Sequence, residues 1–280
     1  FGCLIAVSSD WIIAHASGNC GDILGYPVDD LLGLRFVDFF PNETIHDLRS
    51  RVQILAHQDG AARIFNYDVF GNGQRFDISV HRSERFLVFE FEPRQGHSVS
   101  NYDGSVVQNL IARVQRHERL EAMCKEASRG LKALTGFDRV MVYRFEPDDT
   151  GTVIAEALTP GLEPYLGLRY PASDIPKQAR ALYLRSPLRI IADVDGPISP
   201  ILPGTGPTGA PLDLSMATTR AVSPIHLEYL RNMGVAASMS VSIVRKGRLW
   251  GLFACHHTKP LQIDYERRSA VELFGQLFTY

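Results

Sequence analysis

The sequence lacks any apolar run long enough to cross a bilayer, and it lacks a secretory leader. Its apolar stretches are short, whereas a membrane-spanning helix needs roughly 18–20 consecutive apolar residues. The N-terminus shows no basic stretch followed by an apolar core and a cleavage site, as a leader would. We therefore expect a cytoplasmic protein with no membrane partner.

Concentrated charge of one sign is missing too. The formal net charge is −2 and no run of Lys or Arg forms a basic patch, so we expect no nucleic-acid partner. The four cysteines, Cys3, Cys20, Cys124 and Cys255, are scattered without CxxC spacing. Structural zinc and a disulfide framework are therefore not expected, and buried reduced thiols are the ordinary interpretation.

The common catalytic patterns are also absent. The chain contains no GxSxG, GxxxxGK[ST] or HExxH motif, and no GxGxxG after a strand. The neighbours Cys255, His256 and His257 resemble a metal cluster only in composition, because successive strand residues point to opposite faces. We expect neither an enzyme active site nor a metal centre in this chain.

A chain of 280 residues is long for one compact core, so two domains are expected. Residues 1–97 begin with a strand at 4–7 and continue through short helices. Gly71-Asn72-Gly73, between two strand-like segments, predicts a hairpin, and a further strand follows at 85–91. This order is PAS-like, and the polar, aperiodic segment 93–103 is the expected linker.

Residues 98–280 form the second expected domain. Apolar residues at helical spacing, with one slip, predict a long helix over 105–134, and Gly136 stands where a C-cap belongs. The remaining predicted elements are strands at 139–145, 152–157 and 189–194, helices at 176–184 and 226–233, a Pro/Gly-rich loop at 196–211, a hairpin at 237–244 and 248–256, and a last helix capped by Asp264. Helices around an antiparallel sheet suit a GAF domain. The predicted fold class is α+β, PAS followed by GAF, each with a central antiparallel sheet and flanking helices.

The segment Ser238-Met-Ser-Val-Ser-Ile243 alternates hydroxyl and apolar side chains. As a strand it places three serines on one face, which fits either a solvent-facing sheet or the polar wall of a ligand cavity. If residues 245–247 form a three-residue loop, Ser240 faces Leu252, Ser238 faces Ala254, and His256 shares the serine face. A two-residue loop would put His256 on the opposite face. We expect the three-residue loop, whose register suits a partly anionic ligand.

Three other residues each allow a functional and a structural interpretation. Arg189 and Arg220 offer planar forks that bind carboxylates, but either can be a surface charge. His226, which follows Ser223-Pro-Ile, can be a capping or core histidine as readily as a ligand contact.

Three motifs resemble the GAF domains of phytochromes. They are Tyr170-Pro-Ala-Ser-Asp-Ile-Pro-Lys-Gln-Ala-Arg-Ala-Leu-Tyr183, Arg220-Ala-Val-Ser-Pro-Ile-His-Leu-Glu-Tyr-Leu-Arg-Asn-Met-Gly234 and Leu249-Trp-Gly-Leu-Phe-Ala-Cys-His-His257. They occur in the family's order and spacing, and the resemblance covers essentially the whole chain. It is closest to bacteriophytochromes and less distinctive in the PAS portion.

The resemblance implies a linear tetrapyrrole, biliverdin IXα, in the GAF pocket. The PASDIP stretch supplies Asp174, Ile175 and Pro176; the Asp174 main-chain carbonyl and His226, through a water, would hold the pyrrole nitrogens. His256 would reach the D-ring carbonyl. The propionates would be held by Arg189, Arg220, Tyr183, Ser223, Ser238 and Ser240, and the space for the rotating D ring would be shaped by Tyr143, Tyr170 and Tyr229.

One departure bears on attachment. Plant and many cyanobacterial phytochromes carry the attaching cysteine immediately before the histidine that matches His226, and here that position is Ile225. The resemblance therefore implies a thioether to a cysteine upstream of residue 1. It also implies a figure-of-eight knot at the domain junction, in which the N-terminal segment passes through the loop around 196–211.

The resulting hypothesis is a red/far-red photoreceptor fragment, not itself an enzyme, that signals by Z/E isomerisation of its bilin. Both ends have the patterns of interrupted elements, so we expect a longer protein with a C-terminal PHY domain and an output module, such as a histidine kinase, in cis. A homodimer through helices is also expected. The rival interpretations are a GAF module that binds a small regulator such as a cyclic nucleotide, and a bilin-modifying enzyme, which lacks an obvious proton-donor pair.

Overall fold

The computed structural model describes residues 1–57, 60–94 and 104–278. These residues fall into two compact units. Residues 1–94 and 197–221 make the first, and residues 104–196 and 222–278 make the second. Residues 197–221, which we expected in the second domain, instead make their contacts with the first unit. The linker expected at 93–103 lies mostly outside the described residues.

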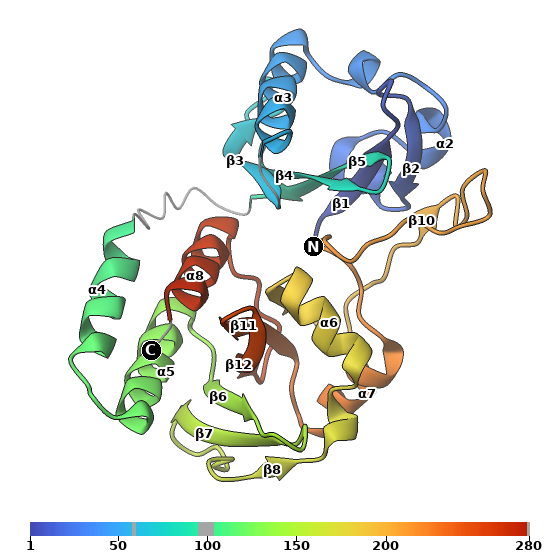
Figure 1. Ribbon diagram of the computed structural model, residues 1–280. Helices are drawn as coiled ribbons and strands as arrows, with labels where there is room; N and C mark the ends of the chain where they lie inside the picture. Colours follow the sequence, from blue (N-terminus) through green and yellow to red (C-terminus); the bar gives the residue numbers. More distant parts are fainter. Residues whose placement is uncertain (58–59, 95–103, 279–280) are drawn as a thin grey trace. The chain divides into compact units, whose positions relative to one another are not determined.

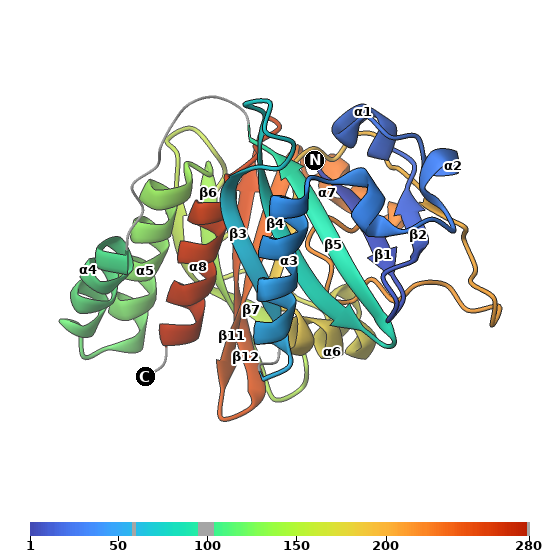
Figure 2. The same cartoon turned by 90° about the horizontal axis from the view of Figure 1, so that it is seen from above.

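The first unit is built on a six-stranded antiparallel sheet in the order β10-β2-β1-β5-β4-β3 (Figure 1). Its elements are β1 Cys3–Val7, β2 Ile13–Ser17, α1 Cys20–Leu24, α2 Val28–Leu31, the 3-10 helix η1 Phe36–Phe39, α3 Asn42–Leu55, β3 Ala61–Asp68, β4 Arg75–Ser83, β5 Phe86–Pro93 and β10 Ile201–Leu202. Helix α3 lies against β3 and β4 (Figure 2). The predicted hairpin at Gly71-Asn72-Gly73 joins β3 to β4, and Gly71 and Gly73 take the positive φ angles of 70° and 86° that its turn needs.

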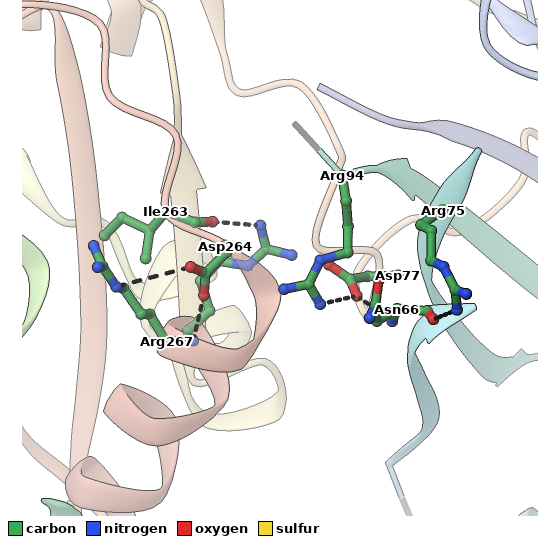
Figure 3. A network of polar contacts seen from close by, with 8 residues as sticks. Asn66, Arg75, Asp77, Arg94, Ile263, Asp264 and Arg267 are labelled. Carbon is green, nitrogen blue, oxygen red and sulfur yellow. Dashed lines mark hydrogen bonds and ion pairs between the residues drawn. The ribbon is translucent and has the colours of Figure 1, made fainter. Parts of the chain in front are cut away.

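The sheet of the first unit has two different faces. One face packs a core of stacked aromatic rings, among them Phe36, Phe89 and Phe91. The other is largely polar and is covered by residues 197–221, whose Leu212 and Ala217 are buried in a small apolar cluster. On β4, Asp77 is paired with Arg94 at 3.1 Å (Figure 3).

The second unit has a six-stranded antiparallel sheet in the order β8-β7-β6-β12-β11-β9. Its strands are β6 Arg139–Phe145, β7 Gly151–Leu158, β8 Arg169–Tyr170, β9 Leu188–Ile191, β11 Ala237–Arg245 and β12 Arg248–His257. Its helices are α4 Gly104–Gln115, α5 Leu120–Thr135, the 3-10 helix η2 Ala172–Asp174, α6 Lys177–Arg185, α7 Pro224–Asn232 and α8 Tyr265–Leu277. Within this unit α4, α5 and α8 lie on one side of the sheet, and α6 and α7 on the other (Figure 1). The α+β class is confirmed, with an antiparallel sheet and flanking helices in each unit.

Two end signals of the second unit are confirmed. Gly136 closes α5 with φ 80°, and its N–H donates to the carbonyl of Lys132. Asp264 caps α8 by accepting the N–H of Arg267 at 2.8 Å (Figure 3).

The single long helix predicted for 105–134 is wrong. The chain leaves the helix after Gln115 and restarts at Leu120, so α4 and α5 form a helical hairpin. The slip in the apolar pattern falls at this break, where the residues 116–119 are all ionisable and exposed. Gly130 of α5 lets the helices approach, because a Cβ there would lie 2.1 Å from a methyl group of Leu110 on α4.

Candidate functional site

The sheet of the second unit carries apolar side chains on one face and a polar set on the other. On β11, Met239, Val241 and Ile243 are buried, and Val241 adjoins Gly275 of α8. The serines between them point the opposite way. Because Ser238 is directly paired with His256 and Ser240 with Ala254, His256 lies on the same face as the serines. That shared face, which we call the serine face, confirms the expected alternation.

The loop and the pairing behind this prediction were wrong. The turn has two residues, Lys246 and Gly247, with φ angles of 51° and 74°, as a type I′ turn requires. Alone it would have turned His256 away from the serines. A bulge opposes Ile243 to Gly251 but Val244 to Leu249, and this extra residue restores the face. The pairs therefore differ from the predicted ones by two positions.

Neighbouring strands extend the serine face on both sides. Arg189 of β9 pairs with Ser240, and its guanidinium lies 4.8 Å from the centre of the Tyr183 ring. Ser242 donates to the main-chain carbonyl of Tyr183 at 2.7 Å, which fixes the start of the turn between α6 and β9. The structure thus brings Arg189, Tyr183 and the serines together, as the resemblance implied.

Two histidines approach this face from different elements. Burial first, and then the positive charge of Arg189, lowers the pKa of His226 on α7. Burial, followed by the charges of Arg139 and His226, lowers the pKa of His256 to about 4. Each histidine is therefore neutral near pH 7, and the effect of His226 on His256 indicates that the two rings lie near each other. The His226 ring stacks on that of Tyr229 at 6.3 Å.

Two buried polar atoms on this face form no hydrogen bond within the protein. The Nδ1 atom of His256 and the Nε atom of Arg189 are buried, and neither has a hydrogen-bond partner in the structure. Leaving such groups unsatisfied costs about 1–3 kcal/mol each. A ligand with carbonyl and carboxylate oxygens would satisfy both, so the donors fit a linear tetrapyrrole with propionates.

A cluster of tyrosines surrounds the PASDIP turn. The rings of Tyr143 and Tyr170 lie 5.9 Å apart. Burial, then the charge of Asp174, raises the pKa of Tyr143 to about 12, and burial followed by the Asp174 charge raises that of Tyr229. Asp174 itself is exposed at the end of η2. The three tyrosines expected near the D ring therefore gather around Asp174.

The two residues after Asp174 support this turn. The main-chain carbonyl of Ile175 accepts the Nε–H of Arg180 at 3.1 Å, and Pro176 precedes the first turn of α6 as its N-cap. Arg180 also pairs with Asp149 at 2.6 Å. These contacts hold the backbone of the PASDIP turn against the loop between β6 and β7.

Two further expected propionate partners lie at the start of α7 and in the segment before it. Ser223 is the exposed N-cap of α7 and makes no side-chain capping bond. Arg220 belongs to the segment that packs with the first unit, where its guanidinium donates to the carbonyl of Ala217. Their assignment to propionates stays a prediction.

Sequence reasoning missed a buried ion pair at the edge of the serine face. Arg139 of β6 and Glu156 of β7 are paired with 7% and 4% of their side chains exposed. Arg139 is the cross-strand partner of His256, and its guanidinium lies 3.7 Å from the centre of the Tyr165 ring. The available signal was Glu156, the one charged residue of β7, next in the chain to a strand β6 that carries two arginines, Arg139 and Arg144.

Other kinds of site are not seen among the described residues. They contain no group of three or more His, Cys, Asp or Glu side chains that could hold a metal ion. None of the helices described is long and apolar enough to span a membrane.

Comparisons with known proteins agree with these features. Residues 1–94 match the family described as PAS fold, and residues 119–279 match the GAF domain family. A bacteriophytochrome of Pseudomonas aeruginosa is 47% identical over 99% of this chain, and cyanobacterial phytochrome B of a Nostoc species is 39% identical over 98%. This chain spans 37% of the length of each relative.

Solved structures give the same result. The chromophore-binding domain of an unusual bacteriophytochrome from R. palustris is 38% identical, with a TM-score of 0.86 over 99% of this chain and 91% of that one. The chromophore-binding domain of Stigmatella aurantiaca phytochrome P1 is 36% identical, with a TM-score of 0.87 over 99% and 92%.

Proposed function

Since this chain belongs to the phytochrome family, as a PAS–GAF chromophore-binding domain of the bacteriophytochrome type, we propose that it binds biliverdin IXα on the serine face. Z/E isomerisation at the bond between rings C and D is the chemistry that the bilin supplies. The protein contributes shape, charge compensation and proton placement. The proposal keeps domain bounds of 1–97 and 98–280, although residues 197–221 belong to the first compact unit.

The observation that carries this proposal is the pair of unsatisfied buried groups, His256 Nδ1 and Arg189 Nε. Both groups belong to a face that also presents hydroxyls. A linear tetrapyrrole such as biliverdin has carbonyls at its ends and two propionates along one side. Arg189 would bind a propionate through its planar fork. Tyr183, Ser238 and Ser240 would complete that site, and Ser223 and Arg220 would hold the propionates from the start of α7 and the residues before it.

Neutral imidazoles suit the other end of the ligand. His226, with its lowered pKa, would accept a hydrogen bond through a water from the pyrrole N–H groups of a cationic bilin, and the main-chain carbonyl of Asp174 would accept another. His256 would contact the D-ring carbonyl. Tyr143, Tyr170 and Tyr229 would bound the space for that ring, while Ile175 and Pro176 fix the turn.

Attachment and context are part of the proposal. Position 225 is an isoleucine, so we assign the thioether to a cysteine ahead of residue 1. The figure-of-eight knot, a cytoplasmic location and a homodimer through helices stay predictions. Because the relatives are much longer than this chain, a PHY domain and an output module such as a histidine kinase are proposed in cis.

The absorption spectrum tests the proposal. The purified protein is mixed with biliverdin and measured in the dark and after red light. We expect a strong red band that changes reversibly on illumination, and we expect Arg189→Ala to bind more weakly. A colourless protein that instead binds a cyclic nucleotide would favour the regulatory-module alternative, and chemical conversion of the bilin would favour an enzyme.

A further inference from the structure

A buried carboxylate of the first unit holds the residue that precedes Arg220. Glu90 of β5 is 2% exposed. Its Oε1 atom accepts two hydrogen bonds from Thr219, one from the main-chain N–H at 2.9 Å and one from the hydroxyl at 2.6 Å. Hydrogen bonds to a carboxylate are stronger than neutral ones, and burial strengthens them further.

Packing against Gly2 also restrains the Thr219 side chain. A Cβ on Gly2 would lie 3.0 Å from the Thr219 methyl group and 2.8 Å from the main-chain oxygen of Phe91, so the glycine makes room for this contact. Ala217, two residues earlier, is fully buried. Its main-chain carbonyl accepts a hydrogen bond from the guanidinium of Arg220. Residues 217–219 therefore form a fixed base for the Arg220 side chain.

Other contacts hold the part of the segment 197–221 that lies farther along the chain from Arg220. Ser83 donates to the carbonyl of Asp213 at 2.7 Å, and His15 bonds the carbonyl of Pro203 at 2.9 Å. These contacts secure the segment, whereas the Glu90 bonds reach the residue next to the arginine. The second oxygen of Glu90 faces His81 at 3.8 Å.

We propose that Glu90 is a positioning residue for Arg220. By fixing the main chain at Thr219 it lets the guanidinium meet a ligand carboxylate without first losing conformational freedom, which is how preorganisation raises affinity. The inference rests on the proposed function, because it takes the carboxylate to be a bilin propionate.

The test compares two ligands and two substitutions. Biliverdin has free propionates and biliverdin dimethyl ester has none. Glu90→Ala should weaken biliverdin binding about tenfold, a typical effect of one charged contact, and should leave ester binding unchanged. Glu90→Gln keeps an acceptor oxygen for Thr219 and should bind biliverdin like the wild type. Equal loss with both ligands would show a merely structural role.

A double-mutant cycle and a matched control separate positioning from general loosening. In an Arg220→Ala background, Glu90→Ala should cause no further loss of biliverdin affinity, because the group it positions is gone. Additive losses would overturn the proposal. Ser83→Ala removes a contact to the same segment and should not produce the difference between biliverdin and its ester.

A measurement without ligand keeps the inference separate from the proposed function. Amide hydrogen exchange at residues 219–221 of the unliganded protein should quicken in Glu90→Ala but not in Ser83→Ala. Unchanged exchange would refute the positioning role. Failure of the wild type to colour with biliverdin would instead refute the proposed function, while the exchange result would still report on the anchor.

Discussion

His226 and Asp174 adjoin the same proposed bilin but through different atoms, so their removal should have different results. His226→Ala removes the imidazole that, under the proposed function, would stabilise the cationic bilin. We expect the bilin to bind while its pKa falls by about one unit, the equivalent of one net hydrogen bond. Asp174→Ala keeps the main-chain carbonyl, so binding should survive while photoconversion falls.

Absorbance of the bound bilin against pH, together with the photoconversion yield, measures both effects. Glu228→Ala, an exposed neighbour of His226 on α7, is the matched control and should change neither. If His226→Ala left the titration and the yield as they are in the wild type, His226 would not hold the pyrrole nitrogens.

His256 should make the unliganded protein sensitive to acid. Its folded pKa of about 4 lies below the ordinary 6.5, so between these values the unfolded chain binds a proton that the folded protein does not. Stability therefore falls as the pH falls. Between pH 7 and pH 5 this one group costs about 2 kcal/mol.

Urea unfolding at the two pH values checks this expectation. His256→Gln should lose about 2 kcal/mol less than the wild type on acidification. Some acid sensitivity should remain, because burial also lowers the pKa values of His226 and His81. The same substitution at the exposed His46 serves as a control. An undiminished loss in His256→Gln would contradict the assignment.

At the scale of elements, local signals predicted what local chemistry determines. The glycine turn between β3 and β4, the C-cap at Gly136 and the N-cap at Asp264 were all readable, because each depends on a few adjacent residues. The break between α4 and α5 was visible as a slip in the pattern, but its meaning depends on tertiary packing at Gly130. A continuous helix and a helical hairpin can have the same spacing of apolar residues. Only the packing of one helix on the other distinguishes them.

The serine face shows how a face can be right when a register is wrong. Side-chain alternation has a period of two, so an error of two positions leaves every side chain on its expected face. The bulge places Trp250 as an extra residue between the pairs of Ile243 with Gly251 and of Val244 with Leu249. Gly251 beside it is a weak signal, because an isolated glycine in a strand often marks a bulge but does not fix the register. The charges of Arg139 and Glu156 were visible in the sequence, but their pairing was not, because it joins residues on separate strands.

At the scale of the whole molecule, position in the chain does not tell which unit a segment belongs to. Residues 197–221 are rich in glycine and proline and have no periodicity, so the sequence could not indicate that they pack on the first unit. Apart from the short strand β10, which pairs with β2, single hydrogen bonds such as those at Glu90 and Ser83 hold this segment.

Covalent attachment gives a test that involves the whole protein. A thioether needs a reactive thiol, and the family's alternative position holds Ile225, which is 80% exposed but has no sulfur. All four cysteines are buried. Burial raises the pKa values of Cys124 and Cys255 to about 12, and the hydrogen bond with Cys20, followed by burial, raises the pKa of Cys3, so these three thiols form little thiolate near pH 7. The hydrogen bond with Cys3 lowers the pKa of Cys20, but the Cys20 side chain is fully buried in the core of the first unit. Residues 1–280 should therefore bind biliverdin without a covalent bond. On denaturing gels stained with zinc, bilin fluorescence should follow only a longer chain with a cysteine ahead of residue 1. A fluorescent band from residues 1–280 would show that one of these four thiols reacts and that the upstream assignment is wrong.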